Sequence, residues 1–189
     1  MMRRLRGPAV ILLAAMASLC GGITATTLQR MSIAEMSRAA HTIVRARCEA
    51  SAARWDAGEI WTFTTFEVEE IWKGSASARI TVRLIGGEAG NLKSTVSGVP
   101  RFTPGEEVVL FLEHTAAGDF SVVSWVQGTF RVGRDRATQE EIVRQDTAAA
   151  AMLGSPTHRF EASGTRQMRT DALRALVAGA IENGGGNKE

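Results

Sequence analysis

The sequence predicts a mainly β domain in which five or six strands form a small barrel, with a short helix before it and helices after it. The strongest indication is the run WTFTTFEVEEIWKG at residues 61–74, the densest group of β-branched and aromatic residues in the chain, bounded by Gly58 and Gly74. Several other segments alternate apolar and polar residues with the period of a strand. Helical patterns are confined to the two ends of the chain.

The central run changes faces twice. Its apolar side chains are, in order, Trp61, Phe63, Phe66, Val68 and Ile71. The first two share one parity, the next two have the opposite parity, and the last returns to the first. Because successive side chains of a strand point to opposite faces, these changes predict β-bulges that let the strand coil around a small barrel.

A short helix is predicted before the barrel, over Met31–Ala40. Ser32 and Glu35 have the spacing of a capping box, and Met31 and Met36 have that of a hydrophobic staple. These signals predict a helix that docks on the fold.

Four other segments have strand patterns. They are His41–Ala53, Ala78–Ile85, Glu107–His114 and Phe120–Val132. The third is apolar on both faces, which predicts a strand that is central or covered by a helix. Gly128 interrupts the fourth, which is therefore predicted to be one long strand or two strands joined at a kink.

Helices are predicted after the barrel. Thr138 and Glu141 have the spacing of a second capping box, which predicts a helix over Gln139–Leu153. A last helix is predicted over Thr170–Asn183, and residues 184–189 are expected to be disordered.

Residues 1–25 are predicted to be a signal peptide, so we expect a secreted or periplasmic protein. Three arginines precede a short apolar segment, Ala9–Leu19, and small residues ending at Ala25 offer a cleavage site. The apolar segment is too short for a permanent membrane span, and Leu19 makes Cys20 a poor site for a lipid anchor. The predicted parts of the chain are a signal peptide (1–25), a barrel domain (26–134), a helical extension (135–183) and a tail (184–189).

The charge of the chain gives no indication of a nucleic-acid partner. The chain carries 22 Lys and Arg against 20 Asp and Glu, but three of the arginines lie in the predicted signal peptide. The remainder has 19 basic and 20 acidic residues, a formal charge of −1, so we expect neither nucleic acid nor an anionic membrane as partner. Cys48 is then the single remaining cysteine, and we predict that it is buried and unpaired.

The predicted binding region is the loop of residues 86–105, which is rich in Gly, Ser, Thr and Pro. Loops of this length in compact domains are usually functional or disordered. No glycine motif for phosphate binding is complete here. We predict a surface loop or lid with Glu88, Lys93, Arg101 and Phe102 as its contact residues; a loop that only packs over one end of the barrel is the alternative.

No motif predicts a catalytic residue, a metal ligand or a cofactor. The three histidines have no partner at ligand spacing, and no Gly-x-Ser-x-Gly elbow is present. We interpret Glu67, Glu69 and Glu70 as a solvated face that discourages edge pairing rather than as a metal or catalytic cluster. The tryptophans are assigned to the core and rim of the barrel rather than to a carbohydrate platform.

Three segments carry a resemblance to a known family. They are Ala40–Cys48 (AHTIVRARC), Thr65–Gly74 (TFEVEEIWKG) and Pro104–Leu112 (PGEEVVLFL). They resemble the netrin modules and the tissue inhibitors of metalloproteinases, in a cysteine-poor bacterial secreted form. The resemblance implies an OB-like barrel over roughly residues 32–133 and a secreted location. It does not extend to metalloproteinase inhibition, which in those inhibitors needs an N-terminal cysteine, whereas the predicted mature chain begins at Thr26.

The favoured hypothesis is a non-enzymatic module that binds a protein through the 86–105 loop and the barrel rim. The expected partner is another envelope or extracellular protein, with proteases among the candidates. One alternative is an envelope hydrolase whose site is assembled in space from Glu88, Arg101 or His114; another is a structural envelope component whose last helix docks onto a partner. Perturbed carboxylates beside a histidine in a cleft would favour the hydrolase, and exposed apolar residues on a smooth rim would favour the binding module.

Overall fold

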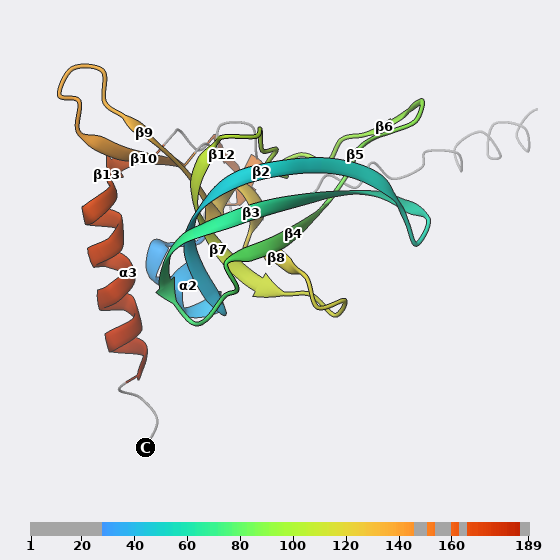
Figure 1. Cartoon of the computed structure of the whole chain (residues 1–189). Helices are drawn as coiled ribbons and strands as arrows, with labels where there is room; N and C mark the ends of the chain where they lie inside the picture. The colour runs from blue at the N-terminus through green and yellow to red at the C-terminus, as the bar shows by residue number, and fades with distance from the viewer. Residues whose placement is uncertain (1–27, 146–150, 154–159, 163–165, 186–189) are drawn as a thin grey trace, which may run out of the picture.

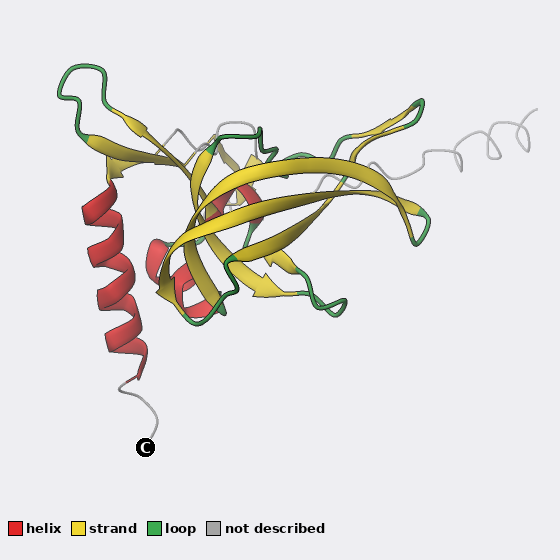
Figure 2. Ribbon diagram, in the orientation of Figure 1, coloured by secondary structure: helices red, strands yellow, loops and turns green. Residues whose placement is uncertain are grey.

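The computed structural model describes residues 28–145, 151–153, 160–162 and 166–185, and these form a mainly β fold (Figures 1 and 2). The predicted signal peptide and its cleavage position lie outside the described residues. In chain order the elements are β1 (Leu28–Gln29), α2 (Ile33–Ala39), β2 (Thr42–Asp56), β3 (Glu59–Lys73), β4 (Arg79–Ile85), β5 (Gly87–Ala89), β6 (Leu92–Ser94), β7 (Glu107–His114), β8 (Phe120–Val122), the 3₁₀ turn η2 (Trp125–Gly128), β9 (Thr129–Arg134), β10 (Glu141–Gln145), β11 (Ala151–Leu153), β12 (Phe160–Ala162), β13 (Arg166–Arg169) and α3 (Thr170–Gly185).

Five strands close into a ring. β2 pairs with β3 on one side and β7 on the other, β3 pairs with β4, and β8 pairs with both β4 and β7. The β4–β8 pairing is parallel, and the other four are antiparallel. The sheet leaves this ring at β7 and continues through β9, β10 and β13, while β1, β11 and β12 form a separate small sheet.

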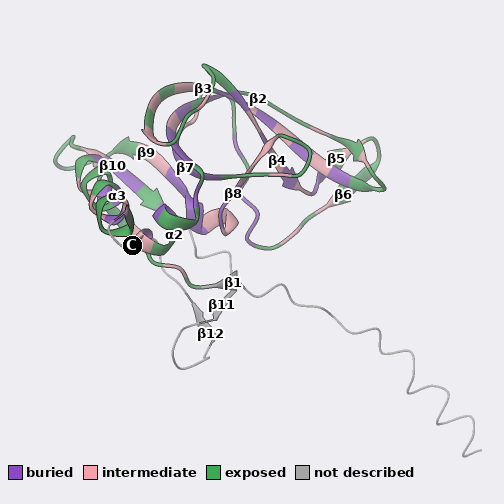
Figure 3. Cartoon of the chain, turned by 90° about the horizontal axis from the view of Figure 1, so that it is seen from below, coloured by how far each residue is buried: buried purple, intermediate pink, exposed green. Residues whose placement is uncertain are grey.

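The strand β7 is buried on both faces, as its sequence predicts. Val108, Leu110 and Leu112 belong to the core inside the ring. Val109 and Phe111 belong to a second core, which the two helices α2 and α3 complete. Figure 3 shows much of β7 in the colour of buried residues. Both cores therefore depend on this one strand.

The segment Phe120–Val132 forms two strands, one of the two arrangements its sequence predicts. The 3₁₀ turn η2 separates β8 from β9 and ends at Gly128. A Cβ at Gly128 would collide with the carbonyl oxygen of Val123, so the backbone passes here at a distance that only glycine permits.

The hairpin of β2 and β3 is long and coiled. Each strand has 15 residues. The pairing skips Glu49 on β2 and Glu69 and Trp72 on β3, so these three residues are bulges. The bulge at Glu69 lies at the change of face between Val68 and Ile71, which confirms that part of the prediction, and the bulge at Trp72 follows Ile71.

The first change of face in the central strand is not a bulge. Trp61 and Phe63 lie on the outer face of β3, and the inner face is continued by the buried Thr62 and Thr64. Arginine side chains cover these aromatic rings and shield them from water outside the core. The guanidinium carbon of Arg54 lies 3.7 Å from the ring centre of Phe63. Counting apolar residues therefore misplaces the inner face of this half of the strand.

The helix α2 has the predicted start. Ser32 accepts a hydrogen bond from the backbone N–H of Glu35 at 3.2 Å, and the Glu35 carboxylate accepts one from the N–H of Ser32 at 2.7 Å. At the other end the Lys73 ammonium donates to the backbone carbonyls of Ser37 at 2.7 Å and Ala40 at 2.5 Å. A cation at the carboxyl end of a helix satisfies carbonyls that have no partner within the helix.

The helix predicted over Gln139–Leu153 is wrong within the described residues. Glu141–Gln145 is the strand β10, paired with β9 and β13, and Ala151–Leu153 is the strand β11. Glu141, which the prediction placed in a capping box, instead binds Arg45, with Nη2 and Oε2 2.8 Å apart. The β-branched Ile142 and Val143 are both buried, so packing overrides the local capping signal.

The last helix is present as α3. Its end at Gly185 shows that the first two residues of the predicted disordered tail are helical; residues 186–189 lie outside the described part. Leu173 and Val177 are buried in the second core with Met36 of α2. Most of this apolar face is buried within its own fold, although Leu176 is 51% exposed. The hypothesis that the helix docks onto a partner is therefore weakened.

The two capping patterns provide a matched stability test. We expect Ser32→Ala to lower the free energy of unfolding by about 1 kcal/mol, because a hydroxyl N-cap is lost. Thr138→Ala should change it by less than about 0.5 kcal/mol, because that hydroxyl lies in an exposed turn and starts no helix. Urea unfolding of the two variants measures the difference. Equal losses would contradict these assignments.

Candidate functional site

The four predicted contact residues, Glu88, Lys93, Arg101 and Phe102, line one pocket. It lies between the β2–β3 hairpin and the short β5–β6 hairpin, both of which extend away from α3 (Figure 1). Its volume is about 510 Å³ and it is open to solvent. Its lining residues are Ser51, Ala53, Thr62, Gly87, Glu88, Lys93, Ser94, Thr95, Arg101 and Phe102. The loop is thus partly a β-hairpin rather than an irregular lid.

Two glycines let the β5–β6 hairpin lie on the β2–β3 hairpin. Gly86 and Gly87 have φ angles of +87° and +142°, which disfavour other residues. A Cβ at Gly87 would lie 2.5 Å from Cβ of Ala53 and 2.6 Å from Oγ1 of Thr62. The backbone of Gly87 therefore packs directly on Ala53 and Thr62, and this contact forms the floor of the pocket.

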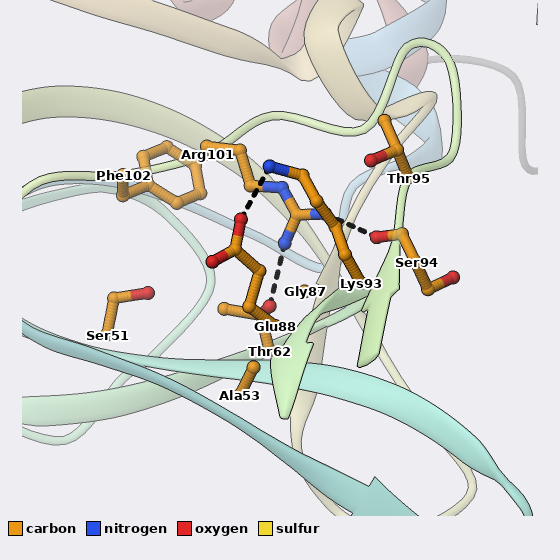
Figure 4. A pocket seen from close by; sticks show the side chains of 10 residues that line it. All are labelled: Ser51, Ala53, Thr62, Gly87, Glu88, Lys93, Ser94, Thr95, Arg101 and Phe102. Atoms are coloured by element: carbon orange, nitrogen blue, oxygen red, sulfur yellow. Dashed lines mark hydrogen bonds and ion pairs between the residues drawn. The ribbon is translucent and has the colours of Figure 1, made fainter. Parts of the chain in front are cut away.

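Arg101 is the best-positioned cation of the pocket. Its Nη1 donates to Oγ1 of Thr62 at 2.8 Å and its Nη2 donates to the backbone carbonyl of Ser94 at 3.3 Å. The Thr62 hydroxyl in turn donates to the carbonyl of Gly86 at 2.6 Å. Both acceptors of Arg101 are neutral, and no described residue forms an ion pair with it. Figure 4 shows the guanidinium among Thr62, Ser94 and Glu88. Its charge is thus held in place without direct neutralisation.

Lys93 and Glu88 form an exposed pair at the mouth of the pocket. They are directly opposite in the β5–β6 ladder, with Nζ and Oε1 2.5 Å apart. Their side chains are 70% and 67% exposed. The hydrogen bond and charge of Lys93, aided by the charge of Arg101, lower the pKa of the Glu88 carboxyl below its ordinary value. Glu88 is therefore an ionised carboxylate and not a proton donor at neutral pH.

This pair can be tested by titration. In Lys93→Met, we expect the pKa of Glu88 to rise toward its ordinary value, because the main cause of its lowering is removed. Carboxyl carbon shifts followed by NMR between pH 2 and pH 7 measure this change. Lys73→Met is the control, since Lys73 binds helix carbonyls elsewhere. An unchanged Glu88 titration in Lys93→Met would refute the assignment.

Phe102 forms the inner wall of the pocket. Its side chain is only 7% exposed and belongs to the core of the ring. It packs edge-on against Phe66, with ring centres 5.0 Å apart and planes at 83°. Because most of the ring contacts the core, Phe102 shapes the pocket wall and offers a partner little contact area.

Apolar side chains project at the tips of both hairpins. Trp55 lies next to the β2–β3 turn and is 53% exposed, and Leu92 follows the β5–β6 turn and is 55% exposed. Large exposed apolar groups are typical of protein-binding surfaces. The position of Leu92 at a hairpin tip was not predictable, because the hairpin of β5 and β6 was not predicted.

Of the residues suggested for a hydrolase, Glu88 and Arg101 line one pocket, but His114 lies elsewhere. His114 lies at the end of β7 and packs against His41 and Phe120, with ring centres 5.3 Å and 4.7 Å away. It does not line the pocket that contains Glu88. Cys48 is buried as predicted, and burial raises the pKa of its thiol, which disfavours the nucleophilic thiolate.

The acidic residues of the central strand surround an arginine. The guanidinium of Arg45 lies 3.6 Å from Glu69 and 3.7 Å from Glu70, and it also binds Glu107 and Glu141. The side chain of Arg45 is 18% exposed. Desolvation lowers the pKa of Arg45, but the hydrogen bonds that it donates to the carboxylates of Glu141 and Glu107 raise that pKa above its ordinary value. These carboxylates therefore stabilise the fold. Among the residues with described positions, no group of three His, Cys, Asp or Glu side chains could hold a metal ion.

Neither the scan of protein-family models nor the search of curated proteins finds a match to this chain.

Within the described ranges, no helix has the length and apolar character needed to cross a membrane.

Proposed function

We propose that this protein is a non-enzymatic binding module of the cell envelope or the extracellular space, which binds another protein through the pocket between its two hairpins. One observation carries the proposal: all four predicted contact residues line a single pocket whose main cation, Arg101, is fixed by neutral acceptors. A positioned charge without a direct counter-ion is suited to a partner carboxylate. Trp55 and Leu92, exposed at the tips of the two hairpins, supply apolar contact area.

The proposed fold family is the OB-type barrel of the netrin modules and tissue inhibitors of metalloproteinases. A ring of five strands, with a parallel pairing between β4 and β8, is compatible with such a barrel. OB barrels bind their ligands through one face and the adjoining loops. The proposed secreted or periplasmic location rests on the predicted signal peptide, and a protease is one candidate partner.

Point variants test the binding proposal better than deletion of the loop, because Val99 and Phe102 of that loop belong to the core. The protein and the variants Arg101→Gln and Trp55→Ala would be immobilised and exposed to an envelope extract. Arg136→Gln is the matched control, since it makes the same charge change in the exposed β9–β10 turn.

We expect a specific protein that the unmodified chain and Arg136→Gln retain, and that Arg101→Gln and Trp55→Ala bind at least tenfold more weakly. Retention of the same proteins by all four samples, or by none of them, would refute this function. Circular dichroism of each variant confirms that its fold is intact.

A further inference from the structure

The outer half of β2 has a strand neighbour on one side only. β2 pairs with β3 along its whole length. Its pairing with β7 covers Thr42 to Arg47 and ends there. The bulge at Glu49 follows, and beyond it residues 50–55 pair with β3 alone among the residues that the structure describes. This part of the hairpin therefore has an open edge.

The register shows which backbone groups face the open edge. On β3, Val68 donates to Ala78 and Ile60 accepts from Gly86, so the even-numbered residues of β3 face β4. Their opposite residues on β2 are Ser51, Ala53 and Trp55. Because antiparallel hydrogen bonds alternate between the two sides of a strand, the N–H and C=O groups of these three residues point away from β3. Neither group of any of them has a hydrogen-bond partner in the described part of the chain.

Between the bulge at Glu49 and the charged Arg54, the open edge has no charged residue and no proline. Exposed edges generally carry charges, proline or a covering segment. Here residues 50–53 are Ala-Ser-Ala-Ala, and three of the four are exposed. Ser51 and Ala53 also form part of the pocket, opposite the side chains of Arg101 and Lys93 (Figure 4). An added strand would thus lie directly beside the pocket.

Cations flank the edge on both faces. Arg101 lies on the inner face, and Arg54 lies on the outer face against the ring of Phe63. Neither arginine forms an ion pair with a described residue. A strand placed here would therefore have a guanidinium on each side, which favours acidic side chains.

We infer that the edge at Ser51, Ala53 and Trp55 receives an extended acidic segment of the partner as an added antiparallel strand, with a carboxylate of that segment bound to Arg101. This inference rests on the proposed binding function and specifies how the partner is recognised. Backbone hydrogen bonds supply affinity in such complexes, and the pocket for alternate side chains supplies specificity. In an antiparallel pair opposite residues share a face, so the acidic residues that point to Arg101 are also those whose backbone bonds the edge.

A synthetic peptide tests the inference on the isotopically labelled protein. The probe is acetyl-Thr-Glu-Val-Glu-Val-Glu-Thr-amide, and its counterpart has Lys in place of each Glu. We expect the Glu peptide to shift the backbone amide resonances of Ser51, Ala53 and Trp55, and the Lys peptide to bind at least tenfold more weakly. No shift at these amides, or equal binding of both peptides, would overturn the inference.

Backbone methylation of the same peptide tests the hydrogen bonds without altering the protein. Methylation of the three Glu amides should weaken binding at least tenfold, because those N–H groups face the edge. Methylation of the two Val amides should leave binding within about twofold, because those groups point outward. Equal effects of the two modifications, or loss only on methylation of Val, would contradict the proposed strand.

A protein variant separates this inference from the binding function itself. Ala53→Pro removes an N–H that points to the open edge, where proline is tolerated, and its fold is checked by circular dichroism. We expect it to lose both the Glu peptide and the protein captured from the extract. If folded Ala53→Pro retains the captured protein while Arg101→Gln loses it, the strand addition is wrong and the binding function stands. If both folded variants retain the captured protein, the strand addition and the binding function are both wrong.

Discussion

Phe66→Ala is expected to lower the free energy of unfolding by about 4 kcal/mol, as large truncations in well-packed cores do. Phe66 has no exposed surface and lies at the centre of the ring, edge-on to Phe102. The ring of β strands cannot collapse onto the vacated volume without breaking its closed pairing, so a cavity would remain. Urea unfolding followed by tryptophan fluorescence measures the loss.

Phe63→Ala is the matched control, because Phe63 lies on the same strand but on the outer face. It should cost only about 1–2 kcal/mol, the contribution of a half-exposed ring and its contact with a guanidinium. Similar losses for the two variants would contradict the assignment of inner and outer faces. Phe66→Ala should also speed amide hydrogen exchange in residues 99–103, because Phe102 loses the surface on which it packs.

Arg45→Met is expected to lower the free energy of unfolding at pH 7 by about 3 kcal/mol, because removal of one member of a largely buried ionic group leaves the others uncompensated. Four carboxylates surround this guanidinium, those of Glu69, Glu70, Glu107 and Glu141. The value is placed at the low end of the usual range because Glu141 is partly exposed to solvent. Arg45→Lys is the control and should cost less, since it keeps the charge but loses the forked hydrogen bonds.

The effect of Arg45→Met should depend on pH. Arg45 lowers the pKa of Glu141 in the folded protein, chiefly by hydrogen bonding. A carboxyl group with a lowered folded pKa contributes stability above its unfolded pKa of about 4.3 and loses it as the pH falls through the folded pKa. The difference between the unmodified protein and Arg45→Met should therefore be largest near neutral pH and diminish below about pH 4. A constant difference from pH 7 to pH 3 would show that lost packing, not charge, is responsible.

Short-range patterns predicted much of the fold because they reflect contacts within one element. The capping box at Ser32 involves residues three apart, and the two apolar faces of β7 report its burial directly. Gly128 marked the break between β8 and β9 because no side chain fits beside the carbonyl of Val123. These features depend on local geometry, which the residues of a single segment determine.

Interactions between distant segments account for the failures. Thr138 and Glu141 have the same spacing as Ser32 and Glu35, but Arg45, 96 positions away, binds the Glu141 carboxylate. Arg54 and Arg83 cover Phe63 and Trp61 from neighbouring strands, with 3.7 Å and 4.1 Å from guanidinium carbon to ring centre. No pattern within either segment records such partners.

Only the pocket residues of the 86–105 loop were predictable from the sequence. Composition and length identified the 86–105 segment, and its four named residues do line the pocket. Ser51, Ala53 and Thr62 are contributed by the β2–β3 hairpin, and nothing in their sequence context indicates a site. The glycines at positions 86 and 87 were the available signal, since paired glycines after a strand indicate a close approach of backbone segments.

The position of β7 between two cores has a consequence for the time course of folding. Met36 and Val177, near opposite ends of the described chain, meet in the second core. Such long-range contacts require closure of large loops and predict refolding in milliseconds to seconds rather than microseconds. A ribosome would have to release nearly the whole chain before β7 could be covered on both sides. Until then its apolar face would be open to aggregation, so we expect the nascent protein to depend on a chaperone more than its size alone suggests.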